Sequence, residues 1–86
     1  MAANRYILRL YQFGTIRRQV EASLDPRDDS RLRELLEQQV QAYAGSLRLD
    51  LSHGWKLVVL TAGATGPGRI HAVVTVNRSG RTVVKR

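Results

Sequence analysis

The chain contains no cysteine, so disulfide bonds and cysteine-based zinc sites are both excluded. Two histidines remain as the only soft metal ligands, and we assign no metal site, no cofactor and no small-molecule substrate. Long apolar runs are also missing: the aliphatic stretch at residues 57–60 is far shorter than the ~20 residues that cross a bilayer. The first ten residues lack the apolar core of a secretory signal. These absences favour a cytoplasmic protein with no membrane partner.

Acidic residues are absent from both ends of the chain. All seven lie within residues 21–50, whereas residues 1–20 carry four basic residues and residues 51–86 carry six, within a net charge of +7. Twelve of the fourteen basic residues are arginines. Charge segregated in this way suits a polyanionic partner, although an arginine bias of the coding genome, with the side chains simply solvated, also accounts for it.

The length of 86 residues fits one domain, residues 1–86. One amphipathic helix is predicted at residues 26–44, where the apolar stripe recurs at three- and four-residue steps. Its members are Leu32, Leu35, Leu36, Gln39, Val40 and Tyr43. Asp25 is the expected N-cap, and Gly45 can take the left-handed conformation that ends a helix.

The rest of the chain has the period of two that is typical of strands. We expect strands at residues 5–11, 47–51, 55–61, 69–76 and 81–85. Residues 15–24 fit either a strand or a helix, and a strand is slightly favoured. The predicted fold is α+β: one long amphipathic helix on a mostly antiparallel sheet of five or six strands, in the order strand, strand, helix and four strands, with the second strand possibly helical.

The face of the sheet away from the helix is expected to be basic. Its predicted members are Arg5, Arg9, Arg48, His71, Thr75, Arg81 and Lys85. Guanidinium groups suit phosphates because their planar forks donate two parallel hydrogen bonds to one anion. The residues that we expect to contact nucleic acid are Arg5, Arg9, Arg69, Arg81 and Lys85.

The same strands carry apolar residues on both faces of the sheet, whereas a single helix covers only one of the two faces. Val58, Leu60, Val73 and Val83 therefore need a second cover, which predicts a homo-oligomer interface at these positions. The alternative is that residues 15–24 form a second helix over this face. An oligomer and a polyanion would compete for one surface. An oligomer that buries the centre of this face would leave only its basic rim for the polyanion.

If residues 15–24 are helical, the order of one strand, two helices and a meander of strands resembles the RelE/ParE toxin family of small basic ribosome-dependent ribonucleases or gyrase poisons. The resemblance implies an RNA-cleaving toxin but assigns no functional residue. Independently of it, His71 beside Arg69 on a basic strand is a candidate acid or base, and an exposed strand histidine without a catalytic role is the alternative. The arginine and tyrosine arrangement near the C-terminus of that family has no counterpart here, because no aromatic residue follows Trp55.

We assign no catalytic residue, and the leading hypothesis is a non-enzymatic binding module for nucleic acid. A protein–protein interaction module or inhibitor of the phage or mobile-element type, bound to an acidic protein surface, is the second hypothesis. The RNA-cleaving toxin is the third.

Overall fold

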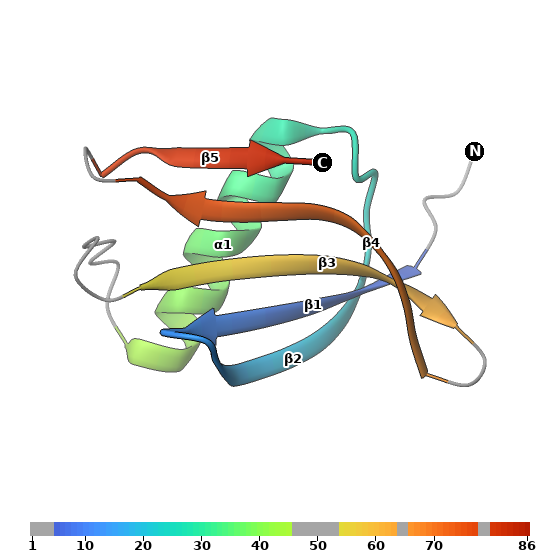
Figure 1. Cartoon of the computed structure of the whole chain (residues 1–86), viewed down its shortest axis with the longest axis horizontal. Helices are drawn as coiled ribbons and strands as arrows, with labels where there is room; N and C mark the ends of the chain where they lie inside the picture. The colour runs from blue at the N-terminus through green and yellow to red at the C-terminus, as the bar shows by residue number, and fades with distance from the viewer. Residues whose placement is uncertain (1–4, 46–53, 64–65, 78–79) are drawn as a thin grey trace.

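The computed structural model describes residues 5–45, 54–63, 66–77 and 80–86. One helix lies across a five-stranded antiparallel sheet, as Figure 1 shows. In chain order the elements are β1 (Arg5–Gln12), β2 (Thr15–Ser23), α1 (Asp29–Ala44), β3 (Trp55–Gly63), β4 (Gly66–Val76) and β5 (Thr82–Lys85). The α+β class is confirmed, and residues 15–23 form the favoured strand. The strand expected at residues 47–51 lies outside the described residues.

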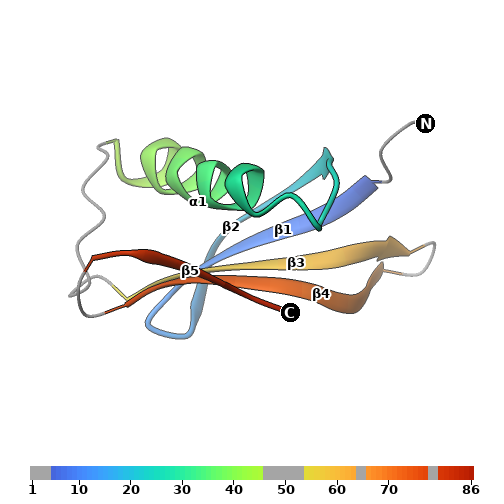
Figure 2. The same ribbon diagram turned by 90° about the horizontal axis from the view of Figure 1, so that it is seen from above.

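The sheet has the strand order β2-β1-β3-β4-β5. β1, β3 and β4 therefore lie inside the sheet, each with an antiparallel partner on both sides. Because successive side chains on a strand alternate between faces, Leu8 and Leu10 of β1 face α1, whereas Ile7 and Arg9 face the opposite way. Figure 2 shows α1 over one face only, which leaves the other face open.

The core fills the space between α1 and the sheet. Leu32, Leu36 and Val40 of the helix are fully buried against the apolar side chains of β1, β3 and β4, as the stripe predicts. Arg18 ties β2 to the helix, since its Nε donates to Oε1 of Gln39 at 2.7 Å. No helix in the described part of the chain has the length and apolarity needed to span a membrane.

The helix begins three residues later than predicted. Asp28, not Asp25, is the N-cap, and its carboxylate accepts a hydrogen bond from the backbone N–H of Arg31 at 3.2 Å. Asp25 instead closes the preceding turn, because its side chain accepts from the Arg27 N–H and its carbonyl accepts from the Asp28 N–H. Gly45 ends the helix in the left-handed conformation, as expected.

Candidate nucleic-acid interface

The sheet surface away from α1, here called the open face, is ordered by strand register into three rows. Its central row is Gln19, Arg9, Val58, Val73 and Lys85, which pair across all five strands. On one side lies the row of Ile16, Tyr11, Lys56, Thr75 and Val83, and on the other the row of Glu21, Ile7, Leu60 and Ile70. The open face thus has an apolar centre with basic residues around it.

Three cations of the open face are fixed by contacts to neighbouring side chains. Arg9 donates from Nε to Oε1 of Gln19 at 2.7 Å. The Nζ atom of Lys56 lies 4.9 Å from the centre of the Tyr11 ring, within the range of a cation–π interaction. Arg5 forms an exposed ion pair with Glu21, with 3.7 Å between the nitrogen and the carboxylate oxygen. Each cation still has donors for a phosphate.

The two sides of the molecule differ in net charge. Arg5, Arg9, Lys56, Lys85 and Glu21 give the open face a net charge of +3. The helix and the turn before it, residues 25–44, carry five acidic and three basic residues and so have a net charge of −2. Arg18 and Arg86 contact this segment and balance its charge, so the positive excess of the two sides lies on the open face.

The predicted oligomer residues all lie on the open face. Val58 and Leu60 are only 6% exposed and form a small cluster with Ile7, packed by the half-buried Val73. Val83 is half-buried in the adjacent row. A single chain therefore already covers the centre of this face, and the large apolar side chains that remain exposed on it are Ile16 and Ile70.

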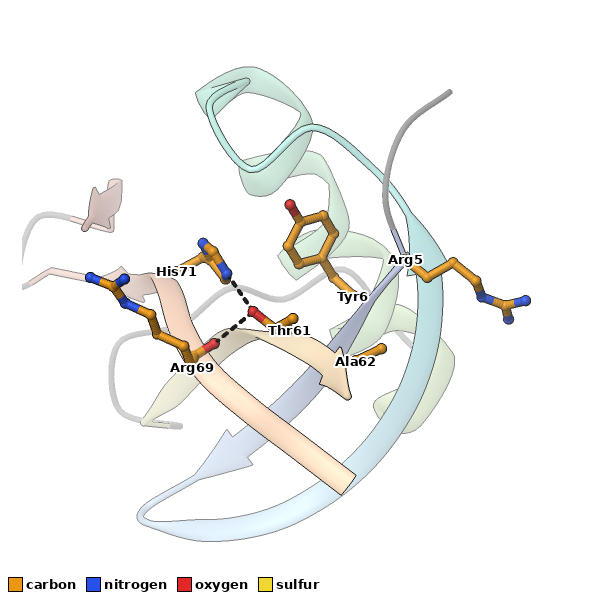
Figure 3. A pocket seen from close by; sticks show the side chains of 6 residues that line it. All are labelled: Arg5, Tyr6, Thr61, Ala62, Arg69 and His71. Atoms are coloured by element: carbon orange, nitrogen blue, oxygen red, sulfur yellow. Dashed lines mark hydrogen bonds between the residues drawn. The ribbon is translucent and has the colours of Figure 1, made fainter. Parts of the chain in front are cut away.

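A pocket of about 540 Å³ opens at one end of the sheet, where β1 begins and the β3–β4 hairpin turns. Its lining residues are Arg5, Tyr6, Thr61, Ala62, Arg69 and His71. Figure 3 shows Tyr6, Thr61 and His71 close together, with Arg5 and Arg69 at opposite sides and their guanidinium groups pointing outward. The pocket thus combines two cations with a tyrosine and with the hydrogen-bonded pair of Thr61 and His71.

His71 lies in this pocket and not on the open face, so its predicted position is wrong. The reason is a register shift: Val59 pairs with Ala72 and Leu60 pairs with Ile70, which leaves His71 as the extra residue of a β-bulge. Its ring meets the Tyr6 ring edge-on at 5.3 Å, and its Nε2 atom is hydrogen-bonded to the Thr61 hydroxyl at 2.5 Å.

The structure separates the five residues predicted to contact nucleic acid into three places. Arg9 and Lys85 are in the central row of the open face, whereas Arg69 lines the pocket and Arg5 belongs to both. Arg81 is exposed just before β5, and Arg48 lies outside the described residues. The sequence reasoning missed Lys56, although its even spacing from Val58 and Leu60 places it on the same face.

Within the described residues no group of three histidine, aspartate or glutamate side chains could hold a metal ion. Comparison of the chain with protein-family models, with curated proteins and with solved structures finds no match. The order of elements that resembled the RelE/ParE family required a helix at residues 15–24, where the structure has β2. The site must therefore be interpreted from its own chemistry.

Proposed function

We propose that the chain is a small binding module that holds nucleic acid on its open face through phosphate contacts. The observation that carries the proposal is the central row, which has Arg9 near one edge of the sheet and Lys85 at the other. Three strand spacings separate these two residues, or about 14 Å. A ligand that contacts both must be an extended anion and not a single phosphate.

The surroundings of this row support the same ligand. Glu21 is the one acidic residue in the rows of the open face, and the Arg5 side chain already neutralises it. Lysine and arginine side chains bind a phosphate backbone by releasing its condensed counterions, which needs no sequence recognition. We therefore expect strong dependence on salt and weak dependence on base sequence.

The test measures the affinity of the chain for labelled oligonucleotides by fluorescence anisotropy as salt is raised. Arg9→Gln and Lys85→Gln should each lower the slope of log K against log salt concentration by about 0.7 on a single strand. Arg33→Gln is the matched control, because it removes the same charge from the exposed surface of α1. Absence of binding at low salt, or an equal effect of the control, would contradict the proposal.

A second candidate function is RNA cleavage in the pocket, which the meeting of His71, Tyr6 and two arginines favours. His71 would take the proton of a ribose 2′-hydroxyl, whose oxygen attacks the adjacent phosphorus. The bond from phosphorus to the 5′-oxygen then breaks, and that oxygen takes a proton from Tyr6 or water. Incubation with end-labelled RNA tests this function: cleavage products that disappear in His71→Ala support it, and intact RNA excludes it.

A protein partner on the open face is the remaining candidate, and the exposed Ile70 favours it because 57% of this residue is accessible. The partner is an acidic protein or, for a homo-oligomer, a second copy of the chain. It would bind with fixed stoichiometry and survive nuclease treatment. A complex recovered from lysate only without nuclease points to nucleic acid instead.

A further inference from the structure

The turn between β1 and β2 holds an aromatic residue in a conformation that it rarely adopts. Gln12 pairs with Thr15, so the turn has two residues, Phe13 and Gly14, with φ values of 49° and 80°. Two positive φ values are typical of a type I′ turn, for which Asn-Gly is the common sequence. A bulky residue with positive φ is an outlier, and such outliers concentrate at functional sites.

Phe13 is fixed in place by Gly54. The Phe13 backbone N–H donates to the Gly54 carbonyl at 3.1 Å. The Phe13 ring lies directly against the glycine, since a Cβ at position 54 would be only 2.5 Å from Cδ1 of the ring. Despite these contacts, 69% of Phe13 is exposed. The fold therefore holds an apolar ring against Gly54 at the surface, where neither the core nor the turn requires it.

The surroundings of this ring are basic. Figure 2 shows that the β1–β2 turn extends to the side of the sheet away from α1. Tyr11 and Lys56 lie at the end of the open face that is next to this turn, in the row that begins with Ile16. Of the four arginines in residues 1–20, the exposed Arg17 is the nearest to the turn along the chain. In the described part of the chain, the β1–β2 turn and the two strand residues on either side of it carry no acidic side chain that could pair with a basic protein.

Together these observations describe an aromatic platform beside an electropositive surface, which is how proteins bind unpaired bases. We propose that Phe13 stacks on a base and that the ligand of the open face is single-stranded nucleic acid. The inference rests on the proposed function, and it adds the strandedness of the ligand. In a duplex both faces of each base are covered by neighbouring bases, so the ring has nothing to stack on.

The test compares a single-stranded oligothymidine with a duplex of the same length at constant salt. The native chain should bind the single strand more tightly, and Phe13→Asn should weaken that binding about tenfold, within the range measured for loss of one stacked base. Asparagine suits the turn, so this variant is expected to fold. Phe13→Tyr keeps a ring and should retain the affinity. Tyr43→Ala is the matched control: it removes a half-exposed aromatic residue of α1 whose ring meets Trp55 edge-on at 6.0 Å, and Trp55 fluorescence checks that this variant is folded.

A second readout is available because Phe13 is the single phenylalanine of the chain. Isotopic labelling of phenylalanine then gives the ring signals of this residue alone, and stacking of a base should shift them upfield when the oligonucleotide is added. Equal affinity for single strand and duplex, or native affinity in Phe13→Asn, would overturn the inference while leaving the proposed function in place. Absence of binding to both oligonucleotides would overturn both.

Discussion

Gly54→Ala should displace the Phe13 ring and destabilise the chain through two separable effects. Gly54 has a φ of +62°, which costs an L-residue about 1–2 kcal/mol. The new Cβ would also collide with the Phe13 ring, since it would lie 2.5 Å from Cδ1 and 2.7 Å from Cε1. The ring is exposed and can turn away, so the collision costs only the contact that the ring loses.

The size of that contact follows from its burial. With 69% of Phe13 exposed, the remaining third of a side chain of about 200 Å² covers about 60 Å². At ~25 cal/mol per Å² this area contributes about 1.5 kcal/mol. Gly54→Ala alone should therefore lower the free energy of unfolding by about 3 kcal/mol. In the Phe13→Asn background only the backbone effect of about 1–2 kcal/mol remains.

Urea denaturation of the four proteins in this double-mutant cycle measures the coupling between Phe13 and Gly54. Trp55 is the single tryptophan, lies next to Gly54 and is 5% exposed, so its fluorescence reports unfolding directly. We expect a coupling energy of about 1.5 kcal/mol. A coupling near zero would show that the ring does not depend on Gly54, and the argument for a fixed aromatic platform would then fail.

Asp28→Ala should lower the free energy of unfolding, measured by urea denaturation, by about 1 kcal/mol, because the Arg31 N–H loses its capping acceptor. An unchanged free energy would contradict the assignment of Asp28 as the N-cap. Hydrogen bonds from Arg27, chiefly from its backbone N–H, lower the pKa of Asp25. Its carboxylate therefore stabilises the fold above the unfolded pKa and loses this effect as pH falls through the folded pKa. The difference in the free energy of unfolding between the native chain and Asp25→Asn should shrink on acidification below about pH 4. A difference that stays constant with pH would show that the Asp25 carboxylate does not stabilise the fold. Val73→Lys should convert any oligomer to monomer in sedimentation velocity, whereas an unchanged oligomer would place the interface elsewhere.

The periodic elements could be predicted because their pattern is local. Leu32, Leu36 and Val40 recur at helical spacing and are all buried. The start of α1 could not be fixed in the same way, since Asp25 and Asp28 are equally good caps by type. Which aspartate caps the helix depends on the turn that Asp25 closes. In that turn the Asp25 carboxylate accepts a hydrogen bond from the Arg27 N–H and so is not the cap.

The candidate site was less predictable because it depends on strand order and on irregular backbone. Arg9 and Lys85 are 76 residues apart in the chain and share a row only because β1 and β5 belong to one sheet. Strict alternation predicts the wrong face for His71, because a single β-bulge reverses the face of the residues that follow it. No signal in the sequence shows that Phe13 has a positive φ.

The positive charge of the open face and the balanced charge of the helix side give the molecule an electric dipole, with the positive end on the open face. An approaching polyanion experiences this field before any contact forms, within the screening distance of about 10 Å at moderate salt. This field orients the protein so that the open face meets the ligand first. The orientation raises the association rate constant more than it lowers the dissociation rate constant. The acidic residues of α1 thus act on a ligand that they never touch, because they cancel the positive charge that would otherwise attract it to the helix side.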